Sequence, residues 1–351
     1  MAEINVGLVG ITGYAGMELC RLLAQHPKMH LTMACSRAES GKRLGSYYPF
    51  LERLAGCDVI ISTFDPREAA KHCSLVFLAV PAGTAMQMTP QLLEQNLRVV
   101  DFSADFRLHD PDVYEKWYAI PHGAKEALQQ AVYGLPEFYA DKISQSRLIA
   151  NPGCYPTSVL LALKAPLEHD LIETDNILID SKSGATGAGR GAKIQNLFCE
   201  VSDTFRAYGL ATHRHTPEIE QELSLLAKKE LRVQFTPHLV PMNRGILSTI
   251  YTTLKDPRVS DTEIHEAFCD TWSDTKWVRV LPLGKLPETR FVRGTMFCDI
   301  GIVRDPRTNR LLIVSVIDNL CRGAAGQAIA NANLMCGFDV GEGLAMHAPL
   351  V

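Results

Sequence analysis

The sequence predicts an α/β chain of two domains: a parallel-sheet domain with crossover helices, then an α+β domain with a mixed or antiparallel sheet. A length of 351 residues favours two hydrophobic cores over one. In the first part of the chain, short apolar runs alternate with helical stretches, as in a parallel sheet with crossover helices. Further on, the strand candidates become longer. We expect domains at 1–150 and 151–320, with the segment 321–351 returning to complete the first.

Composition and charge exclude several classes of protein. Hydrophobic residues make up 46% and charged residues 21% of the chain, and the net charge of −4 favours neither a nucleic-acid nor a membrane partner. No apolar run approaches the roughly 20 residues that a membrane-spanning helix needs. The strand pattern in "MAEINVGLVGITG" begins almost at once, so we expect no signal peptide and a cytoplasmic location.

The ten cysteines run from Cys20 to Cys336 without a CxxC pair, so we expect reduced thiols and no disulfide framework. No Cys/His cluster has ligand spacing, so no metal site is predicted. Cys154 lies in a polar turn, and we expect the other nine to be buried.

The first strand and helix are joined by a glycine-rich turn. "INVGLVG" predicts a strand, and "YAGMELCRLLAQHP" has helical periodicity. Between them stand Gly10, Gly13 and Gly16, spaced GxxGxxG rather than GxGxxG. Such glycines let the backbone approach a pyrophosphate at a helix N-terminus, which predicts a Rossmann-type dinucleotide site. A tight turn without a ligand is the alternative.

The end of the second strand indicates which dinucleotide binds. An NAD site usually carries an acidic residue there, but this chain has Ser36 and Arg37, with Lys42 nearby. A hydroxyl and cations suit a 2′-phosphate, so NADP(H) is favoured. Glu39 lies beyond the strand end. Arg37 as a solvated surface residue is the alternative.

Two further loops follow strands at the same edge. The loop of "FLAVPAGTA", with Pro81, should border the cofactor, because ligands of open α/β sheets lie outside the carboxyl ends of strands. "DFSADFRLHD" supplies Ser103 and Arg107, and Arg107 can hold a phosphate or carboxylate through two hydrogen bonds. A surface arginine paired with Asp105 or Asp110 is the alternative.

Cys154 stands in "ANPGCYPTS", just before a helix predicted to begin near Thr157. Peptide dipoles at a helix N-terminus favour an anion and lower the pKa of a thiol. Pro152 and Pro156 stiffen the turn, and Gly153 leaves the sulfur uncrowded. Cys154 is therefore the candidate nucleophile.

"ATHRHTPEIEQEL" offers the nucleophile a proton partner. If residues 213–216 are extended, His213 and His215 project to the same side, and Pro217 suits the first turn of a helix. Two imidazoles with Glu218 in the following helical turn can supply an acid/base and a substrate contact. A structural role for one histidine stays open.

The remaining segments outline the second domain. The glycine-rich loop of "SKSGATGAGRGAK" lacks the Walker pattern, so we expect it to line a cleft. Strands are predicted at "VQFTPHLVP", "GILSTIYTTL", "CDIGIV" and "LLIVSVID", and a helix at "DTEIHEAFCDTW". A last helix over 318–334 should return to the first domain.

These motifs together resemble the N-acetyl-γ-glutamyl-phosphate reductase family, within the aspartate-semialdehyde dehydrogenase-like superfamily. The resemblance runs nearly end to end, through "GITGYAG", "DFSADFRL", "YGLPE", "ANPGCYPTS", "SGATGAGR", "HRHTPEIEQ", "PHLVPMNRGI" and "DNLCRGAAGQA". It implies that Cys154 is the nucleophile, which forms a thioester from the acyl phosphate before NADPH reduces it. One histidine of the HRH motif, His215 rather than His213, would be the acid/base.

The resemblance also implies the other site residues. Arg107, Ser103 and Glu218 are expected to bind substrate. The residues expected at the cofactor are Gly10, Thr12, Gly13, Tyr14, Gly16, Ser36, Arg37, Pro81, Ser183, Gly184 and Asn319.

Two alternatives stay open within this resemblance. Reductases of a carrier-linked aminoadipyl phosphate in lysine biosynthesis share most of these motifs, although the near-neutral charge favours a free small substrate. A non-catalytic NADP(H)-binding sensor would be expected to lack the cysteine or the histidines, and both are present. The resemblance implies a homodimer or homotetramer.

Overall fold

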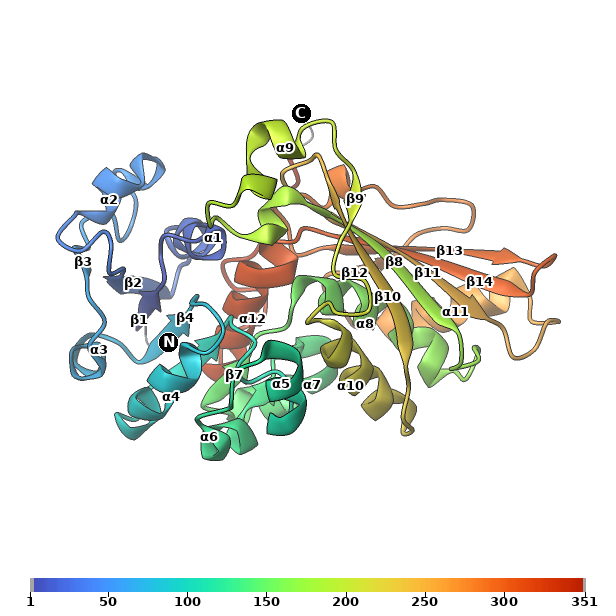
Figure 1. The fold of residues 1–351 in the computed structure, drawn as a ribbon, viewed down its shortest axis with the longest axis horizontal. Coiled ribbons are helices and arrows are strands. Elements are labelled where there is room, and N and C mark those ends of the chain that lie inside the picture. The colour runs from blue at the N-terminus through green and yellow to red at the C-terminus, as the bar shows by residue number, and fades with distance from the viewer. Residues whose placement is uncertain (1–2, 350–351) are drawn as a thin grey trace. The chain divides into compact units, whose positions relative to one another are not determined.

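A computed structural model describes residues 3–349, which form two compact units (Figure 1). The first unit extends to Pro152 and includes Ala324–Ala345. The second is Gly153–Gly323 with residues 346–349. Within the described range, no helix is long and apolar enough to cross a membrane.

The expected returning segment, 321–351, is therefore divided. Ala324–Ala345 counts with the first unit, whereas residues 321–323 and 346–349 count with the second. Of the predicted domains, residues 1–2 and 350–351 lie outside the described part of the chain.

The first unit has a parallel sheet of strand order β3-β2-β1-β4-β5-β7-β6, so the predicted fold class is confirmed here. The chain moves outward from β1 and then returns to place β4 on the other side of β1, so the strand order reverses between these two strands. The strands are β1 (Ile4–Val9), β2 (Met29–Cys35), β3 (Ile61–Ser62), β4 (Leu75–Leu78), β5 (Arg98–Asp101), β6 (Val132–Tyr133) and β7 (Leu148–Ala150).

Helices connect these strands, as the alternating pattern predicts. They are α1 (Tyr14–Leu23), α2 (Leu44–Tyr47), α3 (Pro66–His72), α4 (Ala85–Glu94), α5 (Pro111–Tyr118), α6 (Lys125–Gln130) and α7 (Pro136–Gln145).

The last helix, α12 (Gly326–Met335), is almost wholly buried and packs on α7, α1 and β5 of the first unit. Two of its amides fasten it, because Gln327 Nε2 and Asn331 Nδ2 both donate to the carbonyl oxygen of Gly134, at 2.7 and 2.8 Å. The prediction of a helix from residue 318 was wrong at its start, because a π-helical turn over Cys321–Ala325 precedes α12.

The second unit has a mixed sheet of order β12-β13-β14-β11-β8-β10-β9, in which β8–β10 and β12–β13 pair in parallel and the other pairs are antiparallel. This confirms the predicted mixed sheet. Its strands are β8 (Ile177–Gly184), β9 (Arg206–Ala207), β10 (Val233–Val240), β11 (Ile246–Thr253), β12 (Val278–Val280), β13 (Cys298–Asp305) and β14 (Arg310–Ile317).

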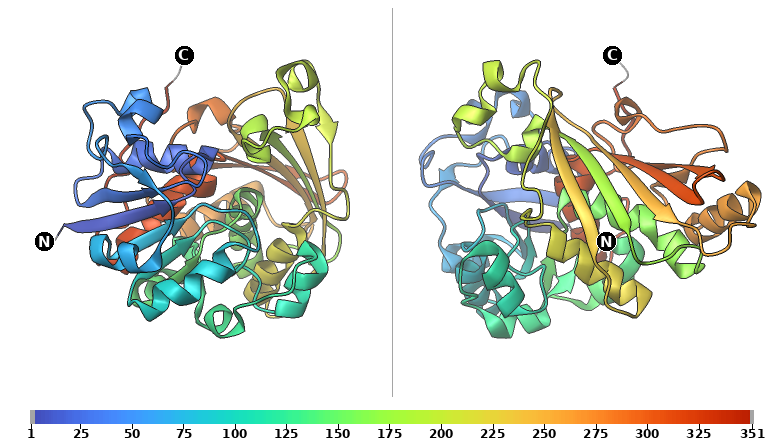
Figure 2. Two further views of the ribbon diagram at one scale, coloured as in Figure 1. Left: turned by 60° about the vertical axis from the view of Figure 1, so that its left-hand side comes forward. Right: turned by 45° about the vertical axis from the view of Figure 1, so that its right-hand side comes forward.

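The helices α8 (Cys154–Glu168), α10 (Thr216–Ala227) and α11 (Asp261–Trp272) gather on one face of this sheet (Figure 2). Along β11, buried and partly buried residues alternate, as expected when helices cover one face. Ser158 of α8 hydrogen-bonds Ser248 of β11 and Ser315 of β14, at 3.0 and 3.1 Å. These hydrogen bonds between buried hydroxyls fix the position of α8 on the sheet.

Candidate functional site

The glycine-rich turn of the first unit brings two backbone segments into direct contact. Gly10 has a φ of +90°, and a Cβ there would lie 2.2 Å from the carbonyl oxygen of Ala79, just after β4. A Cβ on Gly16 would lie 2.5 Å from the carbonyl oxygen of Gly10. The glycines are therefore required by the close packing of the β1–α1 turn, at the point where the strand order reverses.

The beginning of α1 fits an anionic ligand. Gly13 is its N-cap, with no side-chain cap and no acidic residue in the first turn. The hydroxyl of Tyr48 donates to the carbonyl oxygen of Ile11 at 2.8 Å and holds the turn that includes Thr12. Backbone N–H groups at such a helix end suit a pyrophosphate, and Tyr14 opens the helix.

The residues expected to read the ribose lie beside this turn. Gly10 and Ile11 both donate backbone N–H groups to the carbonyl oxygen of Cys35, directly before Ser36. Arg37 is exposed. The carboxylate of Glu39 pairs with Lys42 at 2.5 Å, so the nearby acid is engaged by a lysine.

Pro81 lies in the turn that follows β4 and leads into α4. Its carbonyl oxygen accepts the backbone N–H of Thr84 at 3.1 Å. Because Ala79 touches Gly10, this turn lies next to the glycine-rich turn.

A polar cluster follows β5 in the same unit. Ser103 donates its hydroxyl to Asp101, whose pKa is raised to about 7 by burial and by the charge of Asp105. Arg107 is only 8% exposed, so its interpretation as a surface residue was wrong. Its Nε donates to the carbonyl oxygen of Asn151 and its Nη2 to that of Phe102, both at 2.8 Å. The guanidinium is thus held by backbone oxygens.

Asn151 links that arginine to the last helix. Its backbone N–H donates to the carbonyl oxygen of Asp101 at 2.8 Å. Its side chain donates to the carbonyl oxygen of Ala324 and accepts from Asn331, both at 3.1 Å. The Asn151 carbonyl oxygen that accepts from Arg107 is therefore held in place by β5, through Asp101, and by α12, through Asn331.

In the second unit, Cys154 is the first residue of α8, so the predicted start near Thr157 was wrong by almost one turn. The preceding residue, Gly153, donates its backbone N–H to Oε1 of Glu218 at 2.7 Å. Glu218 is 1% exposed, so the residue predicted to contact substrate satisfies the end of a buried helix. The signal for this role was absent, because the partners are 65 residues apart.

None of the ten cysteines is in a disulfide, and Cys154 is partly exposed. The expectation that the other nine are buried was wrong for three of them. Cys199 and Cys269 are exposed, and Cys336 is partly so.

Tyr155 brings the two histidines next to the Cys154 turn. Its ring centroid lies 5.6 Å from that of His213 and 5.9 Å from that of His215. The two imidazoles are 4.9 Å apart, so the predicted pair is assembled. It forms through a turn rather than an extended segment, because His215 has helical dihedrals and donates its backbone N–H to Nδ1 of His213 at 3.1 Å.

The two histidines differ in their environments. Burial, followed by the charge of Arg214, lowers the pKa of His213 to about 4. A group with that pKa is neutral near pH 7 and does not readily gain a proton there. Nδ1 of His213 also accepts a backbone hydrogen bond, so this nitrogen already has a partner.

Two tyrosines complete this cluster, and neither was singled out from the sequence. Tyr208 donates its hydroxyl to the oxygen of Tyr155 at 3.2 Å, and Tyr155 donates to the carbonyl oxygen of His238 at 3.1 Å. Burial raises the pKa of Tyr155, and it raises the pKa of Tyr208 to about 12, so both hydroxyls stay neutral near pH 7. The only sequence signal for this pair was the position of Tyr155 directly after Cys154.

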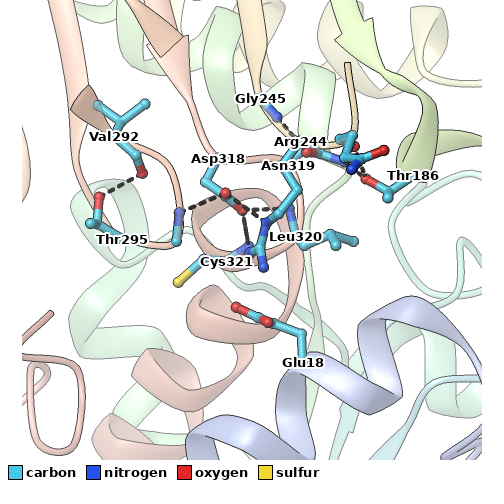
Figure 3. Close-up of polar contacts among 12 residues, drawn as sticks. Glu18, Thr186, Arg244, Gly245, Val292, Thr295, Asp318, Asn319, Leu320 and Cys321 are labelled. Atoms are coloured by element: carbon cyan, nitrogen blue, oxygen red, sulfur yellow. Dashed lines mark hydrogen bonds and ion pairs between the residues drawn. The ribbon is translucent and has the colours of Figure 1, made fainter. Parts of the chain in front are cut away.

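The residues expected at the cofactor in the second unit lie at the end of β8 and after β14. Ser183 is buried, and Gly184 donates its backbone N–H to the carbonyl oxygen of Gly245 at 2.9 Å. Asn319 accepts from the backbone N–H of Gly245 at 2.7 Å and donates to Thr186 at 2.9 Å (Figure 3). Its amide thus ties two loops together. Among residues 3–349, no three His, Cys, Asp or Glu side chains form a group able to hold a metal ion.

Known families match both units. The family described as "Semialdehyde dehydrogenase, NAD binding domain" matches residues 5–146, and "Semialdehyde dehydrogenase, dimerisation domain" matches 154–319.

Curated relatives match almost the whole chain. A protein of Desulfotalea psychrophila named N-acetyl-gamma-glutamyl-phosphate reductase is 49% identical over 97% of this chain and 98% of its own length. Relatives of the same name from Pelobacter propionicus and Geobacter metallireducens are 48% and 49% identical over the same shares.

Solved structures share the fold. Aspartate semialdehyde dehydrogenase II of Vibrio cholerae, complexed with ASA, has a TM-score of 0.71 at 17% identity and covers 96% of this chain and 99% of its own. The Candida albicans aspartate semialdehyde dehydrogenase with NADP has a TM-score of 0.69 at 17% identity, covering 95% and 99%.

The Gly153–Glu218 hydrogen bond gives a test of what Glu218 does. Glu218→Gln keeps an acceptor for the Gly153 N–H, whereas Glu218→Ala leaves that N–H buried and unpaired. We expect the alanine variant to lose about 1–3 kcal/mol of unfolding free energy in urea denaturation, and the glutamine variant to lose much less. If Glu218 instead acts through its charge on a substrate, the glutamine variant should raise KM as strongly as alanine does, without this difference in stability.

Proposed function

The chain belongs to the N-acetyl-gamma-glutamyl-phosphate reductases, and from that premise we propose that it reduces N-acetyl-γ-glutamyl phosphate to N-acetylglutamate 5-semialdehyde in arginine biosynthesis. The observation that carries the proposal is the arrangement at the start of α8. Cys154 opens this buried helix, and the ring of its neighbour Tyr155 contacts the two imidazoles. A thiol with a nearby proton acceptor suits acyl transfer.

Cys154 would act as the covalent nucleophile. Its thiolate attacks the acyl carbon, a carbon–sulfur bond forms, and the bond to the phosphate oxygen breaks, releasing phosphate. The resulting thioester accepts a hydride at the same carbon, and loss of the thiolate then gives the aldehyde. Splitting one displacement into two steps lowers each barrier. His215 would take the thiol proton and stabilise the oxygen of the tetrahedral species by donating to it.

The first unit would hold NADP(H), which supplies the hydride. The tight glycine turn and the start of α1, which has no side-chain cap, suit its pyrophosphate. Ser36 and Arg37 would bind the 2′-phosphate, since the acid nearby is paired with Lys42. We assign further contacts to Thr12, Gly13, Tyr14, Pro81, Ser183, Gly184 and Asn319.

Arg107 and Ser103 would bind an oxyanion of the substrate. The guanidinium of Arg107 is already oriented by two carbonyl oxygens, so little side-chain freedom is lost on binding. For Glu218 we propose an indirect part in substrate binding, through the Cys154 turn. The matched dimerisation-domain family supports a homo-oligomer, either a dimer or a tetramer, and we place the enzyme in the cytoplasm.

The proposal is tested by phosphate-dependent reduction of NADP+ with N-acetylglutamate semialdehyde. Cys154→Ser should abolish this turnover while folding and NADP(H) binding persist, because a serine hydroxyl does not ionise as a thiol does. Iodoacetamide should inactivate the intact protein, and bound substrate should protect it.

The control for this assay is Cys199→Ser, since that thiol is exposed and lies outside the Cys154 cluster. Near-normal turnover by Cys154→Ser would end the covalent mechanism. Activity confined to a carrier-linked aminoadipyl phosphate would assign the chain to the lysine-pathway reaction instead.

The histidine pair predicts a pH profile. His215→Asn should lower kcat by roughly 10²–10⁴-fold and remove the limb of the profile that reports the acid/base. His213→Asn should keep that limb, because the pKa of His213 is about 4 and its imidazole is neutral across the working range. Loss of the limb in His213→Asn, with its retention in His215→Asn, would exchange the two roles.

Arg37 predicts the cofactor preference. The intact protein should bind NADP(H) much more tightly than NAD(H), and Arg37→Ala should reduce this difference by weakening NADP(H) alone. Affinities are measured by fluorescence titration of the reduced cofactors. Arg67→Ala, at an exposed position on α3, is the matched control. Equal affinities of the intact protein for both cofactors contradict the assignment.

A further inference from the structure

Asp318 is a fully buried carboxylate that receives five hydrogen bonds. Arg244 donates to it through Nε and Nη2, at 2.9 and 2.8 Å (Figure 3). The backbone N–H of Gly294 donates at 2.7 Å. Those of Leu320 and Cys321 donate at 2.9 and 2.7 Å. A buried charge is stable only when paired and hydrogen-bonded, and both conditions hold here.

The five donors come from three separate segments of the second unit. Arg244 lies in the turn between β10 and β11, Gly294 precedes β13, and Leu320 and Cys321 follow β14. One carboxylate thus fixes the ends of several strands relative to each other. The neighbouring Asn319 extends the connection to the β8 end, through Gly245 and Thr186.

The loop that Asp318 holds lies directly against Cys154. The backbone N–H of Gly323 donates to the carbonyl oxygen of Asp318 at 2.9 Å, which closes the loop. A Cβ on Gly323 would lie 2.6 Å from Cβ of Cys154 and 3.1 Å from its Cα. Gly323 has no positive φ, so glycine is needed there for space and not for backbone conformation.

Given the proposed role of Cys154, we infer that Asp318 is a positioning residue, which holds the Cys154 thiol in place through the loop that ends at Gly323. The inference rests on the proposed function. Cys154 is then fixed on two sides, by this loop at its Cβ and by the Glu218–Gly153 hydrogen bond at the residue before it. The first turn of α8 keeps one orientation, and the sulfur with it.

The test measures the reactivity of Cys154 without substrate. The rate of alkylation by iodoacetamide is followed against pH, and the modified peptides are quantified by mass spectrometry. Cys199 and Cys269, both exposed, serve as internal references. Because the assay needs no turnover, a failure of the positioning role and a failure of the proposed reaction are observed separately.

Gly323→Ala is the sharpest variant, because its methyl group must displace Cys154. We expect alkylation of Cys154 to slow about ten-fold near neutral pH, the change that one pKa unit of the thiol would produce. The two reference thiols should react as before, and kcat should fall while KM changes little. Gly123→Ala is the control. Apart from the residues next to Gly123 in sequence, the atom nearest to the added Cβ is Sδ of Met86, at an ordinary contact distance of 3.7 Å.

Asp318→Asn should also slow the alkylation of Cys154. Arg244→Lys should slow it less, because lysine keeps the positive charge but loses the bidentate contact with the carboxylate. If both substitutions act by one route, the double variant Asp318→Asn/Gly323→Ala should be no slower than the worse single variant. If Asp318→Asn fails to fold, Gly323→Ala and Arg244→Lys still decide. Unchanged alkylation of Cys154 in folded Gly323→Ala, or in folded Asp318→Asn with only a lower Tm, would overturn the inference.

Discussion

The burial of the first turn of α8 is the constraint on which the site of the second unit depends. Residues 155–163 of this helix are all buried, so its end groups must find partners within the protein. Of the four N–H positions that a helix start leaves over, Gly153 donates to Glu218 and Pro156 has no N–H to satisfy. The other two belong to Cys154 and Tyr155. The sequence "GCYP" therefore accounts for two of these four positions, through Glu218 and through the proline ring.

That arrangement also sets the electrostatics of the thiol. The carboxylate of Glu218 lies at the same helix end, and two anions in a poorly solvated place repel each other. The peptide dipoles of α8 are thus partly offset by Glu218, and a proton acceptor becomes more important. His213, with its pKa lowered to about 4 by burial, contributes shape and low polarity, while His215 lies within reach of the same tyrosine ring.

Much of the fold was predictable because its signals are local. The glycine turn of the first unit could be recognised from the sequence. Gly10 and Gly16 stand where two backbone segments pack too closely for a side chain. Periodicity gave both sheet types and most strands. The start of α8 was misplaced because Pro156 resembles a helix breaker, yet a proline in the first turn has no hydrogen bond to lose. The turn at His213 was also missed, because an imidazole accepting a backbone N–H leaves no sequence pattern.

The residues that sequence alone could not assign all act over long separations. Glu218 reaches Gly153 across 65 positions, and Asp318 reaches Arg244 across 74. Gly323 shows the same limit most clearly. Gly10 can be recognised because it belongs to a glycine-rich motif between a predicted strand and a predicted helix, whereas the space that Gly323 leaves is filled by Cys154, far away in the chain.

The chain passes from one unit to the other at three places, and two of them, Pro152–Gly153 and Gly323–Ala324, adjoin these contacts. Within the first unit, the side chain of Asn151 holds the carbonyl of Ala324, and within the second, Gly323 packs on Cys154. At these two places, the residues on each side of the boundary are therefore held by contacts within their own unit. A cysteine two residues from a crossing needs that anchoring, because a chain segment without it would not present a thiol in one orientation.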